Sequence, residues 1–567
     1  MTQSELIDSK VESLSGTENK PELLDNPAPI NIVMVQDVFQ VGDIKGNADK
    51  IINLSIAASQ QGADLVVFPE LALVGYPPED LLHRQGFLNQ TQSECARIQQ
   101  SLKASIAETG VLFGMPVQEE VNIYNAAVYL VKGEIKQYYF KQSLPNYSVF
   151  DELRYFIAGN KSTIIDVKGH KLAILICEDV WQEDIVSQVK QDGAQAIIVM
   201  NASPFHINKH LERVAILQSN AKQLTLPIMY LNMVGGQDEL VFDGDSLAVS
   251  KNAELVARAK VFEADMIEIT FDGDDISCLQ TKAAELSSDA MVYKALVTGV
   301  RDFVRQNGFT GVVIGLSGGV DSALTLAIAV DALGADNVRA VMMPSRYTAD
   351  MSLEDAEAEA EILGVQYDII AIENIFNCFV ESLAPVFENA PADTTEENIQ
   401  ARSRGLLLMA ISNKSGRMVL TTGNKSEMAV GYATLYGDMC GGFAPIKDVC
   451  KTLVYQLCRY RNEVSLVIPE RVLTRPPTAE LREDQCDQDS LPEYHILDRI
   501  LELSVEQDKP IGEIVAEGID REDVLQVINL VQRNEHKRRQ SAPGIRITRR
   551  AFGRDRRYPI TSGYQRD

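Results

Sequence analysis

Three side chains in the first half of the chain have types and positions suited to breaking a carbon–nitrogen bond. Glu70 follows the apolar run Leu-Val-Val-Phe-Pro, Lys141 follows Tyr-Tyr-Phe, and Cys177 follows Leu-Ala-Ile-Leu-Ile. Each run is typical of a strand, so a shared sheet would bring the three groups to one edge. A carboxylate can take the thiol proton and return it to leaving ammonia, while a thiolate attacks the carbonyl and an ammonium supports the oxyanion. The trio therefore predicts amide hydrolysis through a thioester.

Each of the three residues also has an ordinary explanation. A single buried cysteine is commonly a small apolar core residue, and an acid or an amine at a strand end is commonly solvated. The prediction therefore rests on the three residues occurring together.

A glycine-rich turn in the second half has the features of a phosphate-binding loop. A strand-like run at 312–316 leads into Ser317-Gly-Gly-Val-Asp-Ser322, and a helix-like segment follows. Two glycines permit a tight turn with outward-facing N–H groups, and the helix N-terminus adds partial positive charge. Asp321 can hold a Mg²⁺ ion that bridges phosphates. No lysine follows the glycines as in a Walker A motif, which disfavours γ-phosphoryl transfer of that type. The alternative is an ordinary helix cap preceded by glycine.

The composition narrows the class of protein. The 567 residues include 53 Lys and Arg against 80 Asp and Glu, a net charge of −27. So acidic a surface repels polyanions and argues against a nucleic-acid or membrane binder, whereas a nucleotide enzyme needs only a local positive pocket. No apolar run approaches the roughly 18 residues that span a bilayer, and the first 29 residues lack the features of a secretory signal. The eight cysteines form no C-x-x-C pair, so we expect a reducing, cytoplasmic location without a zinc framework.

The sequence texture divides the chain into two α/β regions. We expect an acidic disordered tail over 1–29, a first domain over 30–270, a linker over 271–288 and a second domain over 289–567. Gly turns between short β-branched runs predict a mixed sheet in the first domain. Its expected strands are 30–35, 65–68, 111–114, 172–176, 196–200 and 228–231, and its expected helices include 48–60 and 93–108.

In the second domain, strand-like and helix-like segments alternate, which predicts a doubly wound parallel sheet. The expected strands are 312–316, 338–343, 367–372 and 418–421, and the expected helices include 292–304, 322–333, 353–363, 399–411 and 427–435. Ligands of such sheets bind beyond the carboxyl ends of the strands, where the turn at 317–322 would lie.

These motifs resemble those of known families. Phe-Pro-Glu70-Leu, Phe-Lys141 followed by Leu-Pro-Asn, and Ile-Cys177-Glu-Asp resemble the nitrilase (carbon–nitrogen hydrolase) superfamily over about residues 30–270. The turn at 317–322 resembles the pyrophosphate loop of the N-type ATP pyrophosphatases. Thr421-Thr-Gly-Asn-Lys-Ser-Glu427, Tyr436-Gly-Asp and the Pro-Pro-Thr-Ala-Glu-Leu run from Pro476 resemble NAD⁺ synthetases. After the tail, the whole chain is similar to the family of glutamine-dependent NAD⁺ synthetases.

The resemblance implies a nitrilase-like four-layer α-β-β-α sandwich joined to a Rossmann-like doubly wound domain of the adenine nucleotide α-hydrolase type. It implies ATP- and glutamine-dependent amidation of deamido-NAD⁺ to NAD⁺ through an adenylate. Ammonia released from glutamine in the first domain would pass through an internal tunnel to the second. Mg²⁺ is the implied cofactor, ATP and L-glutamine are the implied co-substrates, and a homo-oligomer is the implied assembly.

The same resemblance assigns roles to individual residues. Glu70, Lys141 and Cys177 are the implied catalytic residues, and Tyr147, Ser203 and Lys209 would orient glutamine. ATP would be held by Gly315, Leu316, Ser317, Gly318, Gly319, Val320, Asp321, Ser322 and Thr422. Deamido-NAD⁺ would contact Asn398, Glu427 and Lys537, and Mg²⁺ would bind to Asp321 and Glu427. Glu427 is expected to open a helix, where the dipole favours a carboxylate.

Two other functions remain open from the sequence. One is a pyrophosphate-loop amidotransferase for a purine nucleotide or another small carboxylate, against which the Gly-Asn-Lys-Ser-Glu and Tyr-Gly-Asp stretches argue. The other is a non-catalytic nucleotide sensor, although no catalytic position is replaced.

The stretch 533–557 holds ten Lys or Arg against two acids, a pattern that also occurs in nucleic-acid-binding patches. Few aromatic residues interleave with it. We therefore expect a local positive lining for phosphates and carboxylates that includes Lys537, with the rest at the surface or in subunit contacts.

Overall fold

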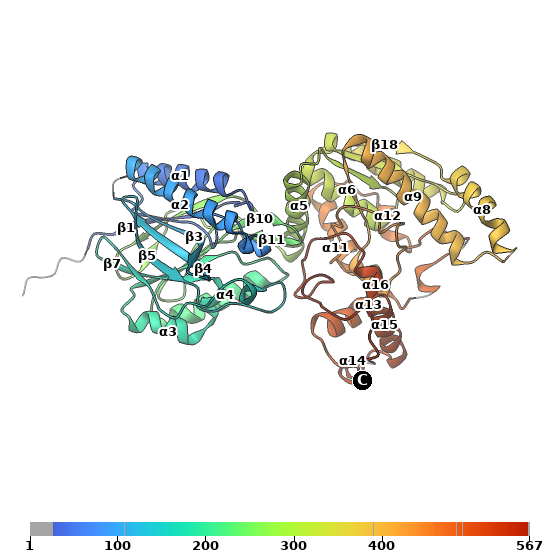
Figure 1. Ribbon diagram of the computed structural model, residues 1–567. Helices are drawn as coiled ribbons and strands as arrows, with labels where there is room; N and C mark the ends of the chain where they lie inside the picture. The colour runs from blue at the N-terminus through green and yellow to red at the C-terminus, as the bar shows by residue number, and fades with distance from the viewer. Residues whose placement is uncertain (1–26, 107, 389, 484, 490, 565–567) are drawn as a thin grey trace, which may run out of the picture.

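The computed structural model describes residues 27–106, 108–388, 390–483, 485–489 and 491–564. They form two α/β units in chain order, with helix α5 (Ser288–Gln306) at the junction (Figure 1). Of the predicted acidic tail, only residues 27–29 are among those described.

The first unit contains two large mixed sheets between pairs of helices. One sheet has the strand order β15-β14-β1-β2-β3-β4-β5 and the other β13-β12-β9-β8-β7-β6. The first sheet consists of β1 (Ile30–Gln36), β2 (Leu65–Val67), β3 (Gly110–Glu119), β4 (Asn122–Val131), β5 (Glu134–Phe140), β14 (Asp265–Phe271) and β15 (Ile276–Ser277). The second consists of β6 (Ile164–Val167), β7 (His170–Ile176), β8 (Ala196–Asn201), β9 (Ile228–Asn232), β12 (Leu247–Val249) and β13 (Leu255–Arg258).

Helices α1 (Ile44–Gln60) and α2 (Gln85–Ser105) cover the first sheet, and α3 (Glu183–Gln191) and α4 (Lys209–Leu224) cover the second (Figure 1). The layers therefore run α-β-β-α, which confirms the predicted fold of this half. Strand β1 shows why apolar residues occupy both of its faces. Ile30, Ile32 and Met34 belong to the core between the sheets, whereas Val33 and Val35 pack with the covering helices. Alternate side chains of a strand point to opposite faces, so a doubly covered strand needs both sets to be apolar.

The second unit is built on a four-stranded parallel sheet of order β18-β17-β16-β19, which confirms the predicted doubly wound class. Its strands are β16 (Val312–Gly315), β17 (Val338–Met342), β18 (Gln366–Ile369) and β19 (Met418–Leu420). The helices around it are α6 (Val320–Leu333), α7 (Asp350–Leu363), α8 (Glu373–Phe387), α9 (Thr394–Ser415), α10 (Lys425–Val430), α11 (Lys451–Val464) and α12 (Glu470–Thr474). A further helical cluster follows, with α13 (Tyr494–Leu501), α14 (Ile511–Ala516), α15 (Arg521–Arg533) and α16 (Glu535–Arg538).

Several predicted boundaries differ from the structure, as α2 and β3 do, and two further differences have a clear local cause. The helix expected over 427–435 is α10, which ends at Val430 because Gly431 has a φ of 74° and turns the chain into the left-handed region. Within the expected linker 271–288, Ile276–Ser277 pair with Thr270–Phe271 as an added strand. Asp272 stabilises the turn before that strand by accepting the N–H groups of Asp274 and Asp275.

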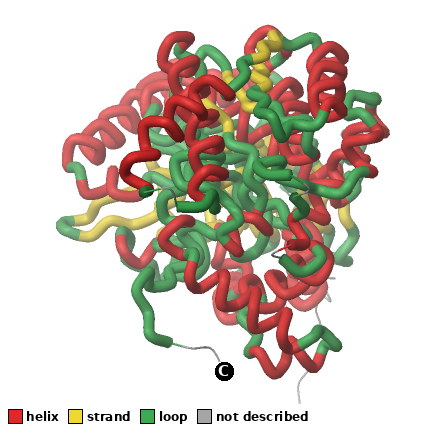
Figure 2. Tube along the Cα trace, turned by 90° about the vertical axis from the view of Figure 1, so that its right-hand side faces the viewer, coloured by secondary structure: helices red, strands yellow, loops and turns green. Residues whose placement is uncertain are grey.

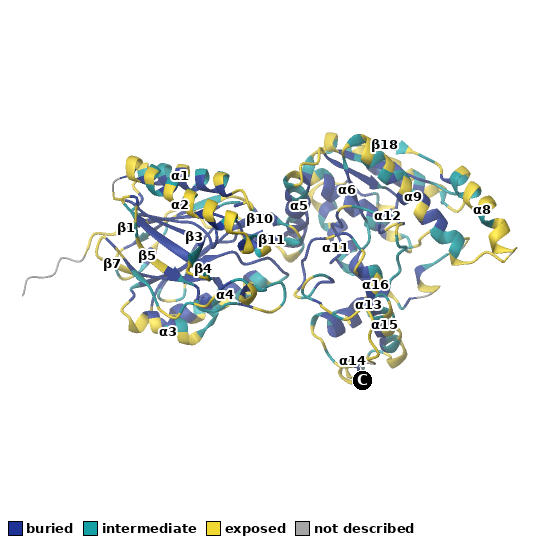
Figure 3. Cartoon of the chain, in the orientation of Figure 1, coloured by how far each residue is buried: buried dark blue, intermediate teal, exposed yellow. Residues whose placement is uncertain are grey.

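In a side view, the helices enclose most of the strands (Figure 2). Most strands of both units are coloured as buried along most of their length, whereas β5 and β18 are largely intermediate or exposed (Figure 3). Among the residues described, none of the helices combines the length and the apolar character that crossing a membrane requires.

The two units touch through α5 and a hairpin of the first unit, β10 (Val234–Gln237) and β11 (Leu240–Asp243). Asp302 of α5 accepts the Gly236 N–H at 2.7 Å, and Gln306 donates to the Gly236 carbonyl at 3.0 Å. These bonds fix the hairpin against the helix.

Candidate active sites

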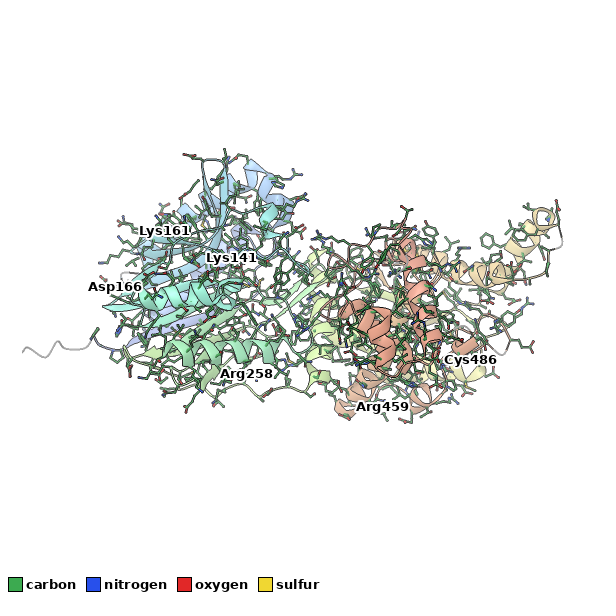
Figure 4. All side chains as sticks on the ribbon, turned by 90° about the horizontal axis from the view of Figure 1, so that it is seen from below. Lys141, Lys161, Asp166, Arg258, Arg459 and Cys486 are labelled. Atoms are coloured by element: carbon green, nitrogen blue, oxygen red, sulfur yellow. The ribbon has the colours of Figure 1, made fainter. Side chains whose placement is uncertain are left out.

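Lys141 follows β5 and is almost fully buried between two carboxylates. Its Nζ lies 2.7 Å from Glu70 Oε1 and 2.8 Å from Glu152 Oε1. Burial alone would lower the pKa of Lys141, but the two carboxylates outweigh it and raise that pKa well above its ordinary value. Lys141 is therefore a fixed positive charge in the interior of the first unit, where Figure 4 shows it.

Glu70 lies just beyond β2 and is held by three donors. Its Oε1 accepts from Asn125 at 2.8 Å as well as from Lys141, and its Oε2 accepts from the Ala202 N–H at 3.0 Å. This network fixes the direction of a carboxylate that is 1% exposed.

Cys177 is the first residue after β7, at the start of a short 3₁₀ turn (Cys177–Trp181). Its φ of 47° is in the left-handed region, which costs a residue with a side chain free energy and is found most often at functional positions. Burial and the negative charge of Glu70 raise the pKa of Cys177 well above its ordinary value, although Lys141 opposes them. The resting thiol is therefore protonated and requires a base before it can attack.

Asp179 fixes the position of the cysteine turn relative to Lys141. It is fully buried, and its Oδ2 accepts from the Ile176 N–H at 3.0 Å and from the Tyr139 hydroxyl at 2.7 Å. Its Oδ1 accepts from the Ser143 N–H at 2.7 Å. One carboxylate thus joins the end of β7 to the segment that follows Lys141.

Glu152 belongs to the cluster but was not among the residues predicted from the sequence. It is 4% exposed, contacts Lys141, and accepts from the Tyr76 hydroxyl at 2.9 Å. Burial raises the pKa of Glu152 to about 7, although Lys141 opposes the shift. The sequence signal that could have identified Glu152 was its position five residues after Tyr147, in Asn-Tyr-Ser-Val-Phe-Asp-Glu.

Of the three residues predicted to orient glutamine, Tyr147 and Lys209 contact the cysteine turn, and Ser203 follows β8, the strand next to β7. Tyr147 is 57% exposed and donates from its hydroxyl to Glu178, the neighbour of Cys177, at 3.0 Å. The Nζ of Lys209 stands 4.3 Å from the centre of the Trp181 ring, at the other end of the turn. Ser203 is buried, and its Oγ accepts from Arg213 at 3.2 Å.

Arg213 was also missed from the sequence. It is fully buried and is paired with Asp243 through one guanidinium nitrogen that lies 2.7 Å from both carboxylate oxygens. A second nitrogen donates to the Ser203 carbonyl at 2.9 Å. The pair fixes the strand end that carries Ser203.

A cavity of about 290 Å³ in the second unit opens beyond the carboxyl ends of β16 and β19. Of the predicted ATP-binding residues, its wall includes Gly315, Leu316, Ser317, Gly319, Val320, Asp321, Ser322 and Thr422. Gly318 is not in the wall. Its φ is 75°, and a Cβ there would lie 2.3 Å from the Ser352 carbonyl, so the loop needs glycine at this position.

Lys451 joins the two predicted magnesium ligands and was not predicted. Its Nζ lies 2.5 Å from Asp321 Oδ2 and 3.0 Å from Glu427 Oε1. Burial raises the pKa of Glu427 to about 8, with Lys451 opposing the shift. Among the described residues, no group of three or more His, Cys, Asp or Glu side chains could hold a metal ion. The carboxylates of Asp321 and Glu427, which both line the cavity, nevertheless fit Mg²⁺. This ion commonly binds through one or two carboxylates and substrate phosphates.

Asn398 and Lys537 lie against the loop after α10 rather than in the cavity wall. Asn398 accepts from the Thr434 hydroxyl at 2.9 Å, and Lys537 donates to the Gly431 and Ala433 carbonyls at 2.8 and 2.9 Å. Because Thr434 lines the cavity, both residues support its wall. The cavity cations that sequence reasoning missed are Arg404, Lys451 and Arg475.

The basic stretch 533–557 differs from the expected positive lining, because none of its residues lines the cavity beside the 315–322 loop. Its arginines are paired with carboxylates instead. Within the second unit, Arg538 and Arg556 contact Glu535, and Arg546 contacts Asp555. Three more arginines reach the first unit, namely Arg549 to Glu212, Arg554 to Glu79 and Arg557 to Asp151.

The two units and their sites define the class of protein. Residues 32–278 match the carbon–nitrogen hydrolase family, and residues 292–541 match the NAD synthase family. The chain therefore combines a carbon–nitrogen hydrolase domain with an NAD synthase domain.

Comparisons with whole proteins identify the family. The glutamine-dependent NAD⁺ synthetase of Acinetobacter baylyi is 48% identical over 540 residues, which cover 94% of this chain and 99% of that protein. The Aquifex aeolicus enzyme of the same name is 43% identical and is covered completely, again by 94% of this chain. The structure of the Acinetobacter baumannii glutamine-dependent NAD⁺ synthetase, in complex with ADP, has 46% identity and a TM-score of 0.77 and covers 95% of this chain and 100% of that one. The chain belongs to the glutamine-dependent NAD⁺ synthetase family.

Proposed function

We propose that this protein converts deamido-NAD⁺, ATP, L-glutamine and water into NAD⁺, AMP, diphosphate and L-glutamate. The observation that carries the proposal is the presence, in one chain of this family, of a thiol–carboxylate–amine cluster and a separate phosphate-sized cavity. The first can release ammonia from an amide, and the second can activate a carboxylate with ATP.

In the first site, Glu70 takes the proton of the Cys177 thiol as the sulfur attacks the amide carbon of glutamine. Lys141 stabilises the negative charge in the tetrahedral intermediate. Glu70 then gives the proton to the departing nitrogen, so that ammonia leaves and a thioester remains on Cys177. Water, deprotonated by Glu70, hydrolyses the thioester to glutamate. Tyr147, Ser203 and Lys209 are proposed to orient glutamine, and Glu152 holds Lys141 in place.

In the second site, the nicotinate carboxylate attacks the α-phosphate of ATP and diphosphate leaves. The 315–322 loop with Thr422 is proposed to hold ATP, and Lys451 can neutralise charge on the leaving diphosphate. Asp321 and Glu427 would hold Mg²⁺, which supplies positive charge to the phosphates when bound. Ammonia then attacks the adenylated carbon, and AMP leaves. Asn398, Glu427 and Lys537 are proposed to shape the deamido-NAD⁺ side of the cavity.

A series of cavities between the two sites supports transfer of ammonia inside one chain. A cavity of about 390 Å³ beside Tyr76 and Glu152 shares Glu79 and Leu240 with a second of about 30 Å³. The second shares Lys447 with a third of about 20 Å³, which shares Thr421, Gly423 and Glu427 with the nucleotide cavity. Even the smallest exceeds the roughly 10–15 Å³ that holds one water-sized molecule. A dry path would also keep ammonia unprotonated and nucleophilic.

We further propose a homo-oligomer in a reducing, cytoplasmic setting. None of the eight cysteines is disulfide-bonded, which suits such a compartment.

Helix α8 has no buried residue although it is apolar, with Phe379 44% and Val386 71% exposed (Figure 3). A second copy packed against α8 would cover them. Sedimentation velocity should give an assembly larger than one chain that Val386→Glu reduces. A monomeric wild type would refute this part of the proposal.

Replacing Cys177 by Ala tests the overall function. We expect glutamine-supported NAD⁺ formation to fall about 1,000-fold or more, because the nucleophile is lost. Ammonium-supported formation should stay within about twofold, because the second site is intact. Cys95→Ala, which removes another buried thiol of the first unit, is the matched control and should retain both activities.

The acceptor is tested by supplying other carboxylates with ATP and an ammonium salt while AMP is measured. AMP release with a purine nucleotide or another acid, and none with deamido-NAD⁺, would contradict the proposed substrate. If Cys177→Ala abolished both nitrogen sources while remaining folded, the division of labour between the sites would be wrong.

A further inference from the structure

An extended segment near the C-terminus, Gly544–Thr548, lies between the two units and is hydrogen-bonded to both. On the side of the first unit, the Arg546 N–H donates to the Glu239 carbonyl at 2.9 Å, and the Ile207 N–H donates to the Ile547 carbonyl at 2.8 Å. On the other side, the N–H groups of Ile547 and Thr548 donate to Asp448 at 2.8 and 2.7 Å. This segment, here called the strap, therefore connects loops from both halves of the chain.

Arg546 is the strap residue whose side chain contacts the 147–152 loop of the first unit. Its side chain is 7% exposed, and its Nε lies 3.0 Å from Asp555, whose side chain is 1% exposed. One Nη2 hydrogen bond goes to Ser148 Oγ at 3.1 Å and another to the Arg549 carbonyl at 2.7 Å. Asp555 and the Arg549 carbonyl hold the guanidinium in place, so its direction toward Ser148 is fixed.

Ser148 occupies the centre of a loop that carries two residues of the first site. Its φ of 53° lies in the left-handed region, which a serine adopts only when the surroundings hold it there. Tyr147 precedes it and contacts Glu178, and Glu152 follows four residues later and contacts Lys141. A donor that holds Ser148 therefore affects both a proposed glutamine contact and the carboxylate that pairs with Lys141.

The strap also contacts the base of the second site. Asp448, which binds the strap N–H groups, forms an ion pair with Lys425 at 2.9 Å. Lys425 also donates to the Thr548 hydroxyl of the strap at 2.8 Å. It is the first residue of α10, the helix that carries Glu427. The position of Arg546 is thus set by residues next to the nucleotide cavity.

We propose that Arg546 is a positioning residue for glutamine hydrolysis, supplied by the second unit and acting through the Ser148 hydroxyl on the 147–152 loop. The proposal rests on the proposed function, because it concerns the efficiency of that glutaminase site. Glutamine hydrolysis at the first site therefore depends on the strap, which is anchored beside the second site.

The test compares glutamine hydrolysis and ammonium-supported NAD⁺ synthesis in Arg546→Gln, Arg546→Lys, Ser148→Ala and the double variant Arg546→Gln/Ser148→Ala. We expect Arg546→Gln to lower kcat/KM for glutamine about tenfold or more, since a partly buried charge-assisted hydrogen bond is lost. Most of the change should be in KM, because Tyr147 is on the affected loop. Ammonium-supported synthesis should stay within about twofold, and Arg546→Lys should recover part of the loss.

Ser148→Ala should have an effect in the same direction, and the double variant should be no worse than Arg546→Gln by more than about twofold, because the two side chains act through one contact. Arg539→Gln is the matched control. It removes a charge from the same basic stretch, but Arg539 pairs with Glu535 inside the second unit and, among the described residues, has no ion pair with the first.

Unchanged glutamine kinetics in Arg546→Gln would overturn the proposal. So would an equal fall with both nitrogen sources, which indicates a structural role, or a double variant whose loss is the product of the single losses. Failure of the proposed function itself would be visible separately, as a wild type that makes no NAD⁺ from glutamine.

Discussion

The Cys177 thiol, buried beside Glu70, keeps its proton at neutral pH, because burial and that carboxylate both raise its pKa. Lys141 remains charged between Glu70 and Glu152. The first site therefore does not store a preformed thiolate. Proton transfer to Glu70 has to accompany substrate attack, which protects the sulfur from unproductive reactions while no glutamine is bound.

Glu359 on α7 is a buried carboxyl for which neither oxygen has a hydrogen-bond partner among the described residues. Burial raises its pKa from 4.5 to about 8. The folded state thus binds the proton more tightly than the unfolded state, so stability is complete below pH 4.5 and is lost as the pH rises toward 8. We expect Glu359→Gln to remove this dependence, worth about 5 kcal/mol by pH 9.

The measurement is the thermal unfolding midpoint at pH 6 and pH 9. Wild type should lose more stability than Glu359→Gln between these two values. Glu357→Gln changes an exposed carboxyl two residues earlier on the same helix and should behave like wild type. If wild type and Glu359→Gln showed the same pH dependence, Glu359 would not be the group responsible.

At the scale of elements, the N-terminus of helix α10 is joined to the phosphate loop, and each of the two carries one predicted magnesium ligand, Glu427 and Asp321. Asn424 caps the helix by accepting the Glu427 N–H at 3.0 Å and also donates to Asp321 at 2.8 Å. The Asn424 side chain therefore caps the helix that carries Glu427 and also orients the Asp321 carboxylate of the phosphate loop. Gly431 ends the same helix after six residues, which frees the following loop to line the cavity.

Asn424→Ala should weaken both functions of this cap. We expect about 1 kcal/mol of lost stability and a fall in NAD⁺ formation of about tenfold with either nitrogen source. Asn424→Ser retains a capping oxygen but is too short to donate to Asp321 as well, so it should keep most of the stability and lose the activity. Steady-state NAD⁺ formation and thermal midpoints check both variants. A loss limited to the glutamine-supported reaction would contradict this role of α10.

The sequence predicted the elements well where apolar periodicity and glycine turns determine them, as for β1, β7, β16 and α6. It also predicted Cys177 and Lys141 at strand ends, and the structure brings Lys141 within reach of Glu70. The residues it missed depend on contacts between distant segments. Glu152 meets Lys141 only because the intervening loop folds back, and Lys451 is 130 positions from Asp321. No local pattern encodes the pair of Lys451 with Asp321.

The same reason explains the basic stretch near the C-terminus. Its sequence resembles an exposed anion-binding patch, yet Arg546 contacts Ser148 across 398 positions, and Arg549 pairs with Glu212 of the first unit. Charges that look unpaired along the chain are paired in the fold. Local composition therefore predicted the charge of this segment but not its place between the units.

At the scale of the whole molecule, the two sites lie in different halves of the chain. Figure 4 shows Lys141 in the first unit, while Arg459 and Cys486 lie in the second. The β10–β11 hairpin, α5 and the strap hold the units together, and the cavity of about 30 Å³ is lined by residues of both units at this junction. This arrangement supports delivery of ammonia from one site to the other without release into water.

An isotope competition measures this delivery directly. Wild-type enzyme is supplied with deamido-NAD⁺, ATP and glutamine labelled with ¹⁵N in the amide, in the presence of excess unlabelled ammonium salt, and the NAD⁺ is analysed by mass spectrometry. Internal transfer predicts that most NAD⁺ carries ¹⁵N, even when free ammonium outnumbers glutamine. If the ¹⁵N content of NAD⁺ fell to the isotopic ratio of the bulk ammonia pool, the two sites would be exchanging nitrogen through solvent, and the central claim would be contradicted.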